Sequence, residues 1–232
     1  MKKIWLPVIV GLLLSFTASA RGYNAQIASY AINAPERVAN NKVALAQYLT
    51  RPYHKDYDKL QSIAYWIASH IAYDGYKYSA GKSSEKEMQY KYDVLQYRTG
   101  ICADYARLFS DLAQIANISG VDYVEGYVLE NQHKIKRFYN GRDVSKRNGH
   151  AWNRVNLGNK RKFFVDTTFM SGARIGDNAI KPGSSFKHKY DVKNRKKQNK
   201  VNTDIDDFFF DFTPQEEVNE HGMLHLMDKF IH

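Results

Sequence analysis

The sequence predicts an α+β fold in which helices precede a group of antiparallel strands. Apolar residues recur at helical spacing from Tyr57 to Ile71, and a second helical pattern follows Cys102. Farther along the chain, His150 to Leu157 and Arg161 to Thr168 alternate like strands on either side of Gly158-Asn159, a turn signal. These observations indicate helices first and a sheet second within the 232-residue chain.

Residues 1–20 have the charge and hydropathy pattern of a secretory signal peptide. Lys2 and Lys3 precede an apolar run from Ile4 to Phe16, and Ala18-Ser19-Ala20 follows it. An uncleaved membrane anchor is the alternative, but a membrane span takes about 20 apolar residues and this run is shorter. The pattern predicts a bacterial protein that is cleaved after Ala20 and exported to the periplasm or the medium. We expect no transmembrane segment in the mature chain.

The rest of the chain divides into three expected parts. An N-terminal helical lead spans 21–56 and contains a helix expected from Pro35 to Leu49. A core domain spans 57–170, and Tyr73 to Tyr92 within it is expected to form a surface loop. A C-terminal extension spans 171–232.

The C-terminal extension combines a basic stretch with a final helix. Residues 184–200 are rich in Lys and Arg and poor in apolar residues, which is typical of an exposed insertion. Thr213-Pro214-Gln215-Glu216 is a capping box that starts the helix. Four phenylalanines between these features are expected to dock on the core: Phe208, Phe209, Phe210 and Phe212. The net charge of +10 favours acidic surfaces, but a charge run is usually a solvated face, so we predict no specific nucleic-acid partner.

Cys102 is the only cysteine in the chain. Exported proteins usually keep cysteines in pairs, and a lone cysteine is more often a small buried hydrophobic residue than a reactive thiol. The position of Cys102 favours reactivity, because it follows Gly100 at the start of a predicted helix. Unpaired N–H groups and the helix dipole stabilise a thiolate at such a position.

His150 and Asp166 are candidates for the imidazole and the carboxylate that a catalytic thiolate needs. A two-residue turn between their strands would place them on opposite faces of the sheet. A three-residue turn at 158–160 pairs position 152 with 166 and makes His150 and Asp166 diagonal neighbours, about 7 Å apart. We predict the three-residue register, which places Trp152 opposite Asp166. It leaves a core-like apolar set on the other face: Ala151, Val155, Leu157, Phe163 and Val165.

Three segments carry a resemblance to a known family. They are Arg98 to Ala106 (RTGICADYA), Gly149 to Asn153 (GHAWN) and Phe164 to Thr168 (FVDTT). In this order they are similar to the transglutaminase-like superfamily, and nearest to its kyphoscoliosis-peptidase and cytokinesis-type branch. The similarity spans about Tyr57 to Thr168, roughly half of the chain.

The resemblance implies a papain-type core, in which the helix that carries the nucleophile packs on an antiparallel sheet. It implies Cys102 as nucleophile, His150 as base and Asp166 as the residue that orients the base. Asp166 has an alternative interpretation as a simple cap at the end of its strand.

The remaining site residues are less defined by the sequence. The backbone N–H of Cys102 is a candidate oxyanion donor, because amides at a helix start point outward. Gln96 and Tyr97 are candidates for a second donor, and Trp152 is expected in the core or the wall of a groove. No cofactor or metal is predicted, since the sequence has no phosphate-binding glycine loop, no calcium-loop pattern and no set of three histidines at metal-ligand spacing.

The expected activity is attack of a thiolate on an amide, with an acyl-enzyme released by water or by a second amine. Hydrolysis by a peptidase or amidase is favoured over cross-linking by the branch that the chain resembles. A non-catalytic module that holds a peptide or a cell-wall strand is the alternative. The expected partner is a protein or peptide substrate, with the cell envelope as one source, and the oligomeric state stays open.

Overall fold

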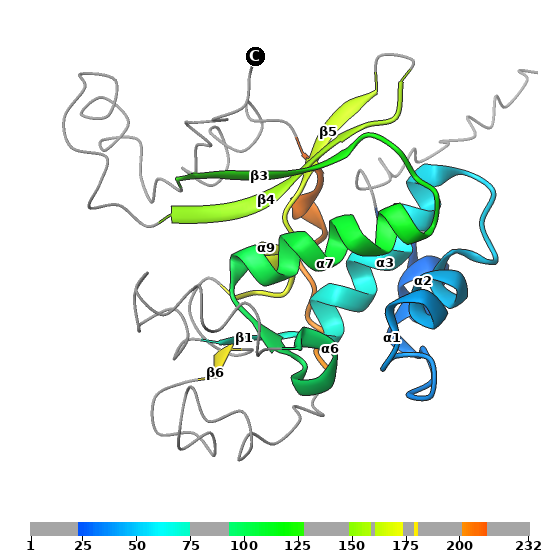
Figure 1. Ribbon diagram of the computed structural model, residues 1–232, viewed down its shortest axis with the longest axis horizontal. Coiled ribbons are helices and arrows are strands. Elements are labelled where there is room, and N and C mark those ends of the chain that lie inside the picture. Colours follow the sequence, from blue (N-terminus) through cyan, green and yellow to red (C-terminus); the bar gives the residue numbers. More distant parts are fainter. Residues whose placement is uncertain are drawn as a thin grey trace, which may run out of the picture.

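The computed structural model describes residues 23–74, 93–127, 149–158, 161–173, 179–180 and 201–212. Figure 1 shows helix α7 between the long strands of the sheet and helix α3, with α1 and α2 on the far side of the helical layer. The predicted signal peptide, the basic stretch 184–200 and the final helix lie outside the described residues. No helix in the described ranges has the length and apolar character to cross a bilayer.

The N-terminal lead contains two short helices rather than one. Helix α1 spans Ala25–Ile32, and Asn24 caps it by accepting hydrogen bonds from two backbone N–H groups. Helix α2 spans Lys42–Thr50, and the Asn41 side chain accepts from the Ala44 N–H at 3.0 Å. The helix expected from residue 35 onward is therefore wrong in its first half: residues 35–41 form turns, because a strong capping residue starts the helix later.

Helix α3, Asp56–His70, is the central element of the core. All residues from Leu60 to Ser69 are buried, so the helix is covered on every side. Asp56 and Asp58 lie in its first turn, where carboxylates interact favourably with the helix dipole. This confirms the helix predicted from Tyr57 onward.

Helix α7, Cys102–Ile115, begins after the short helix α6, Val94–Tyr97, and strand β2, Thr99–Gly100. The Asp104 side chain accepts a hydrogen bond from the Ile101 N–H at 2.9 Å and so fixes the first turn. Position 100 requires glycine, because an added Cβ would lie 2.7 Å from the Asp104 Cβ. The predicted helix after Cys102 is confirmed.

A small parallel sheet has the order β2-β1-β6. Strand β1 spans Ala72–Asp74 and pairs with β2 on one side and with β6, Ala179–Ile180, on the other. The sequence did not predict β1, because three residues are too few to show an alternating pattern. Residues 75–92 of the expected surface loop lie outside the described residues.

The larger sheet is antiparallel and has the order β3-β4-β5-β7. Its strands are β3 (Val121–Tyr127), β4 (Gly149–Asn156), β5 (Lys162–Val165) and β7 (Phe210–Phe212). The pairing runs from Asn153 with Val165 to Asn156 with Lys162, which confirms the predicted three-residue register.

The end of β5 corrects one expectation. The strand stops at Val165 instead of Thr168, and Thr167–Met170 forms the short helix α9. The Asp166 side chain accepts from the Phe169 N–H at 3.0 Å and caps this helix, a local bond that competes with continuation of the strand.

Apolar side chains from both layers form one core. Ala151, Val155, Phe163 and Val165 are buried on the face predicted to be core-like, and Leu157 is half-buried against the core. Phe209, at the end of the 3-10 turn η4 (Asp207–Phe209), and Phe210 and Phe212 of β7 are buried as well. Their docking is confirmed, whereas the Phe208 side chain lies outside the described structure.

Candidate active site

Cys102 is the first residue of α7 and is 7% exposed. Its side chain packs with the buried methyl groups of Ala106 and Ala151, and Ala103 and Tyr123 lie at the border of this cluster. The first N–H groups of a helix have no acceptor within the helix, so they are oriented toward groups beyond its end. The sulfur is therefore covered by small residues and lies beside the positive end of the helix dipole.

His150 lies near the start of β4, where it pairs with Gly126 of β3. The ring is 8% exposed, and its Nε2 lies 2.5 Å from the Asp166 Oδ2. Asp166 is 1% exposed and is held on both sides. Its Oδ1 accepts from the Phe169 N–H at 3.0 Å, and its own N–H donates to the Phe209 carbonyl at 2.9 Å.

Two aromatic rings fix the plane of the imidazole. The ring of Phe169 is stacked with His150 at 4.4 Å between centroids, and the indole of Trp152 is stacked with it at 5.7 Å, both at 20°. Both aromatic side chains are buried. Together with the Asp166 hydrogen bond, they restrict rotation of the imidazole and leave Nδ1 as its second polar atom.

Electrostatics favour the protonated form of His150. Burial lowers the pKa of His150, but the charge and the hydrogen bond of Asp166, followed by those of Cys102, outweigh it and raise that pKa to about 10. The interaction with Cys102 means that the sulfur and the carboxylate act on the same ring. Because Asp166 occupies Nε2, Nδ1 is the nitrogen that remains for the sulfur. The charge and the hydrogen bond of Asp166 therefore favour an imidazolium at this position.

Asn153 ties β4 to α7 under the site. Its Nδ2 donates to the Ala106 carbonyl at 3.0 Å and to the Ser110 Oγ at 2.8 Å. The Asn153 side chain is fully buried. This contact fixes the strand that carries His150 relative to the helix that carries Cys102.

The sequence model of the transglutaminase-like superfamily matches residues 43–167, more than half of the chain. The chain belongs to the transglutaminase-like superfamily. The matched region includes Cys102, His150 and Asp166, and it ends one residue after Asp166. The observed α+β fold, with helices packed on an antiparallel sheet, confirms the fold class expected for this superfamily.

The relatives in this superfamily include two kyphoscoliosis peptidases. Those of Mus musculus and Homo sapiens are each 30% identical to the chain over 128 residues, which is 55% of this chain. The aligned part is 18% of each relative, so the chain spans less than a fifth of their length. A crystal structure of a TGase aligns with 72% of this chain and 38% of its own, at 14% identity and a TM-score of 0.35.

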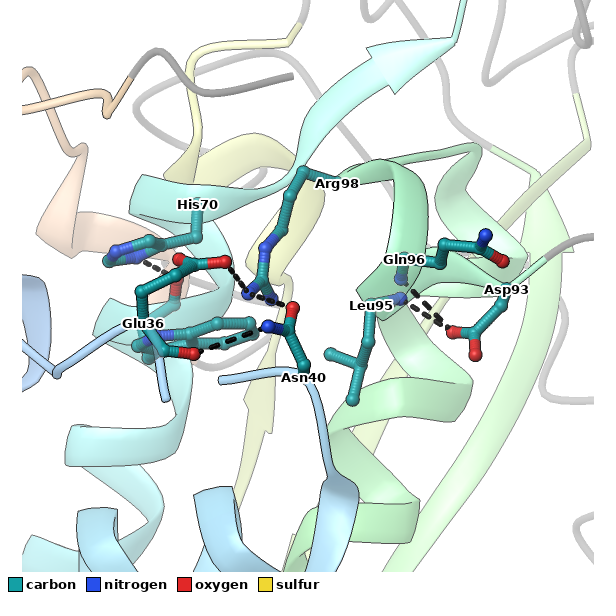
Figure 2. A network of polar contacts seen from close by, with 8 residues as sticks. Glu36, Asn40, His70, Asp93, Leu95, Gln96 and Arg98 are labelled. Carbon is teal, nitrogen blue, oxygen red and sulfur yellow. Dashed lines mark hydrogen bonds and ion pairs between the residues drawn. The ribbon is translucent and has the colours of Figure 1, made fainter. Parts of the chain in front are cut away.

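The two side chains suggested as oxyanion donors lie on α6. Gln96 is exposed, and Figure 2 shows its side chain and that of Arg98 on opposite sides of α6. Tyr97 is buried. Their roles in this transglutaminase-like site stay predictions. Trp152 is buried against the His150 ring, in keeping with a position in the core.

Sequence reasoning missed two residues that shape the site. Phe169 supplies the nearer stacked ring, but it lies just past Thr168, where the expected strand ends, on a helix that was not predicted. Asn153 was detectable, because an amide on the core-facing side of a strand must satisfy its hydrogen bonds inside the protein. The alternation of side chains along β4 places Asn153 on this core-facing side.

Proposed function

We propose that the chain is a cysteine enzyme that cleaves amide bonds through an acyl-enzyme. The observation that carries the proposal is the linked set of Cys102, His150 and Asp166, in which the carboxylate and the sulfur both interact with one buried, stacked imidazole. The transglutaminase-like superfamily includes cysteine peptidases and acyltransferases, which supports this type of chemistry.

In the proposed reaction, the Cys102 thiolate attacks the carbonyl carbon of the substrate and a C–S bond forms. The carbonyl electron pair moves to oxygen, where the backbone N–H of Cys102 stabilises the charge. The imidazolium of His150 transfers its proton to the leaving amine as the C–N bond breaks, which leaves a thioester. Asp166 keeps its charge and holds the ring in orientation.

Release of the thioester determines the reaction type. If neutral His150 removes a proton from water, the product is a carboxylate and the enzyme is a hydrolase. If a second amine attacks, the product is a new amide. We favour hydrolysis of a protein or peptide, because the relatives at 30% identity are named as peptidases. Products of a peptide-library digest separate these outcomes: hydrolysis yields new carboxylates, whereas transfer yields new amides with added amines.

The proposal extends to location. The order of charged, apolar and small residues from Lys2 to Ala20 supports export. We therefore expect the substrate to be an extracytoplasmic protein or peptide, with the cell envelope as one source.

Alkylation of Cys102 by iodoacetamide tests catalysis against the alternative of a binding module. A thiolate paired with His150 is expected to react at neutral pH at least about tenfold faster than free cysteine. The His150→Ala variant should lose this advantage, while Cys102→Ala should not be labelled at all. A rate equal to that of free cysteine in the unchanged protein would favour a module that binds peptide without cleaving it.

A further inference from the structure

Arg98 has a backbone conformation that is commonly found at glycine. It ends α6 with φ 54° and ψ 35°, in the left-handed region. A Cβ atom is disfavoured there, and helices that end this way usually have Gly or Asn at that position. The contacts of the arginine side chain must therefore offset the cost of its backbone conformation.

The guanidinium of Arg98 connects separate parts of the protein. Figure 2 shows it reaching from the end of α6 toward Glu36 and Asn40, and the side chain is only 2% exposed. Its Nη2 lies 3.4 Å from the Glu36 Oε1 and 3.4 Å from the Asn40 Oδ1. Its Cζ lies 4.8 Å from the centre of the Trp66 ring on α3, and that ring is also stacked with His70.

The backbone of Arg98 leads directly to the candidate nucleophile. Its carbonyl accepts from the Ala72 N–H at 2.9 Å, next to the pairing of β1 with β2. Strand β2 then covers the two residues after Arg98, and the next residue, Ile101, donates its N–H to Asp104. Cys102 follows. The segment between the buried guanidinium and the sulfur is thus short and hydrogen-bonded.

Different contacts hold the two parts of Cys102 that the reaction needs. The position of the thiol is set by α7, which is anchored in the core by Tyr105 and Phe109. The N–H of Cys102 belongs to the peptide that joins it to Ile101. That peptide lies between the Ile101–Asp104 hydrogen bond and the preceding segment, which Arg98 and β1 hold in place.

We propose that Arg98 is a positioning residue, which orients the backbone N–H of Cys102 toward the oxyanion. This inference rests on the proposed function, because an oxyanion forms only if Cys102 attacks a carbonyl group. Through Glu36 and Asn40, the same contact makes the N-terminal lead a structural support of the site. The position of the sulfur depends less on Arg98 than the orientation of the Cys102 N–H does.

Two reagents separate these effects. Acetylation of Cys102 by p-nitrophenyl acetate passes through an oxyanion, whereas alkylation by iodoacetamide displaces iodide and forms none. Removal of an oxyanion donor slows acyl transfer by about 100-fold or more, so a misoriented donor in Arg98→Met should slow acetylation by at least about tenfold. Alkylation should change by less than about threefold, because the thiolate and His150 stay in place.

Arg154→Met is the matched control. Arg154 is an arginine whose Nη2 pairs with the Asp122 carboxylate at 3.1 Å at the partly exposed end of β4. Its loss should change neither rate. If Arg98→Met does not fold, a Glu36→Ala, Asn40→Ala double variant removes these two acceptors of the guanidinium while Arg98 remains. In that variant, too, we expect the rate of acetylation to fall much more than the rate of alkylation.

Three outcomes overturn the inference. Equal falls in both rates, in step with a lower melting temperature, would assign Arg98 a purely structural role. Unchanged rates in a folded Arg98→Met variant would leave it no role in positioning. In both cases the proposed function stands, because the wild-type protein still reacts with both reagents. A wild-type protein inert to both reagents would remove the proposed function and this inference together.

Discussion

At the residue scale, Asp166 serves two structural elements at once. One carboxylate oxygen accepts from the backbone at the start of α9, and the other contacts the His150 ring at 2.5 Å. The sequence offered two interpretations of Asp166, a cap at the end of its strand or an orienting carboxylate. The geometry combines the contact with His150 and a cap on the following helix, α9. A single side chain can do so because its two oxygens point in different directions. The pair of His150 and Asp166 could be predicted from strand register, whereas the stacked ring of Phe169 could not, because it depends on where β5 ends.

Asp166→Asn separates charge from capping. Asparagine is also a good N-cap, so α9 should persist. Loss of the carboxylate charge removes the strongest of the influences that raise the pKa of His150, so this pKa should fall from about 10. Titration of the imidazole by NMR measures this shift. A His150 that stays protonated well above neutral pH in the variant would contradict the assignment of Asp166 as its charge partner.

The same pKa shift predicts how stability depends on pH. The pKa of His150 is raised in the folded protein, so its contribution is fully present below about 6.5, the value for an unfolded histidine, and is lost as the pH approaches 10. Between these values, the unfolding free energy of the wild-type protein should decrease by a few kcal/mol relative to His150→Gln. Urea unfolding at several pH values provides the measurement. Parallel pH profiles for the two proteins would argue against a raised pKa.

At the element scale, the positions of α7 and β4 decide the site. The helical pattern after Cys102 was readable from the sequence, because its period is a local property. The turn between β4 and β5 allowed two registers, and the correct one followed from the expectation that His150 and Asp166 share a face. The small parallel sheet was not readable from the sequence, since β1 pairs with segments far along the chain. Asn153 joins the two decisive elements through its contacts with Ala106 and Ser110.

Asn153→Ala tests this connection. The change leaves the Ala106 carbonyl and the Ser110 hydroxyl without their shared donor, and should lower the unfolding free energy by about 1–3 kcal/mol. Asn156→Ala is the control, because Asn156 is exposed and, within the described ranges, its side chain accepts a local bond from the Gly158 N–H. Its effect should stay within about 0.5 kcal/mol. Equal losses of unfolding free energy in the two variants would contradict the role of Asn153 in joining β4 to α7.

At the scale of the whole molecule, the N-terminal lead is part of the domain. Helices α1 and α2 pack on α3, and α2 also packs on α7. Ile27 and Leu45 are buried in the common core. The sequence predicted a helical lead but placed its helix too early, because the capping roles of Asn24 and Asn41 were not recognised. The superfamily match begins within α2, so α1 lies outside the matched region and packs on α3 within it.

Export is a prediction about the whole chain. Expression of the full sequence in a bacterial host should give a mature protein whose N-terminal residue is Arg21, because cleavage is expected after Ala20. N-terminal sequencing of the periplasmic fraction measures this. Recovery of the full-length chain from the cytoplasm alone would contradict the export proposal.

The central claim is that Cys102 forms an acyl-enzyme with the help of His150. The most direct test is the burst of p-nitrophenolate released from p-nitrophenyl acetate, with mass spectrometry of the peptide that contains Cys102. The wild-type protein should release about one equivalent per chain and carry one acetyl group on Cys102. His150→Ala should slow the burst by about 100-fold or more, and Cys102→Ala should abolish it. No burst from the folded wild-type protein, or an acetyl group found only on other residues, would contradict the claim.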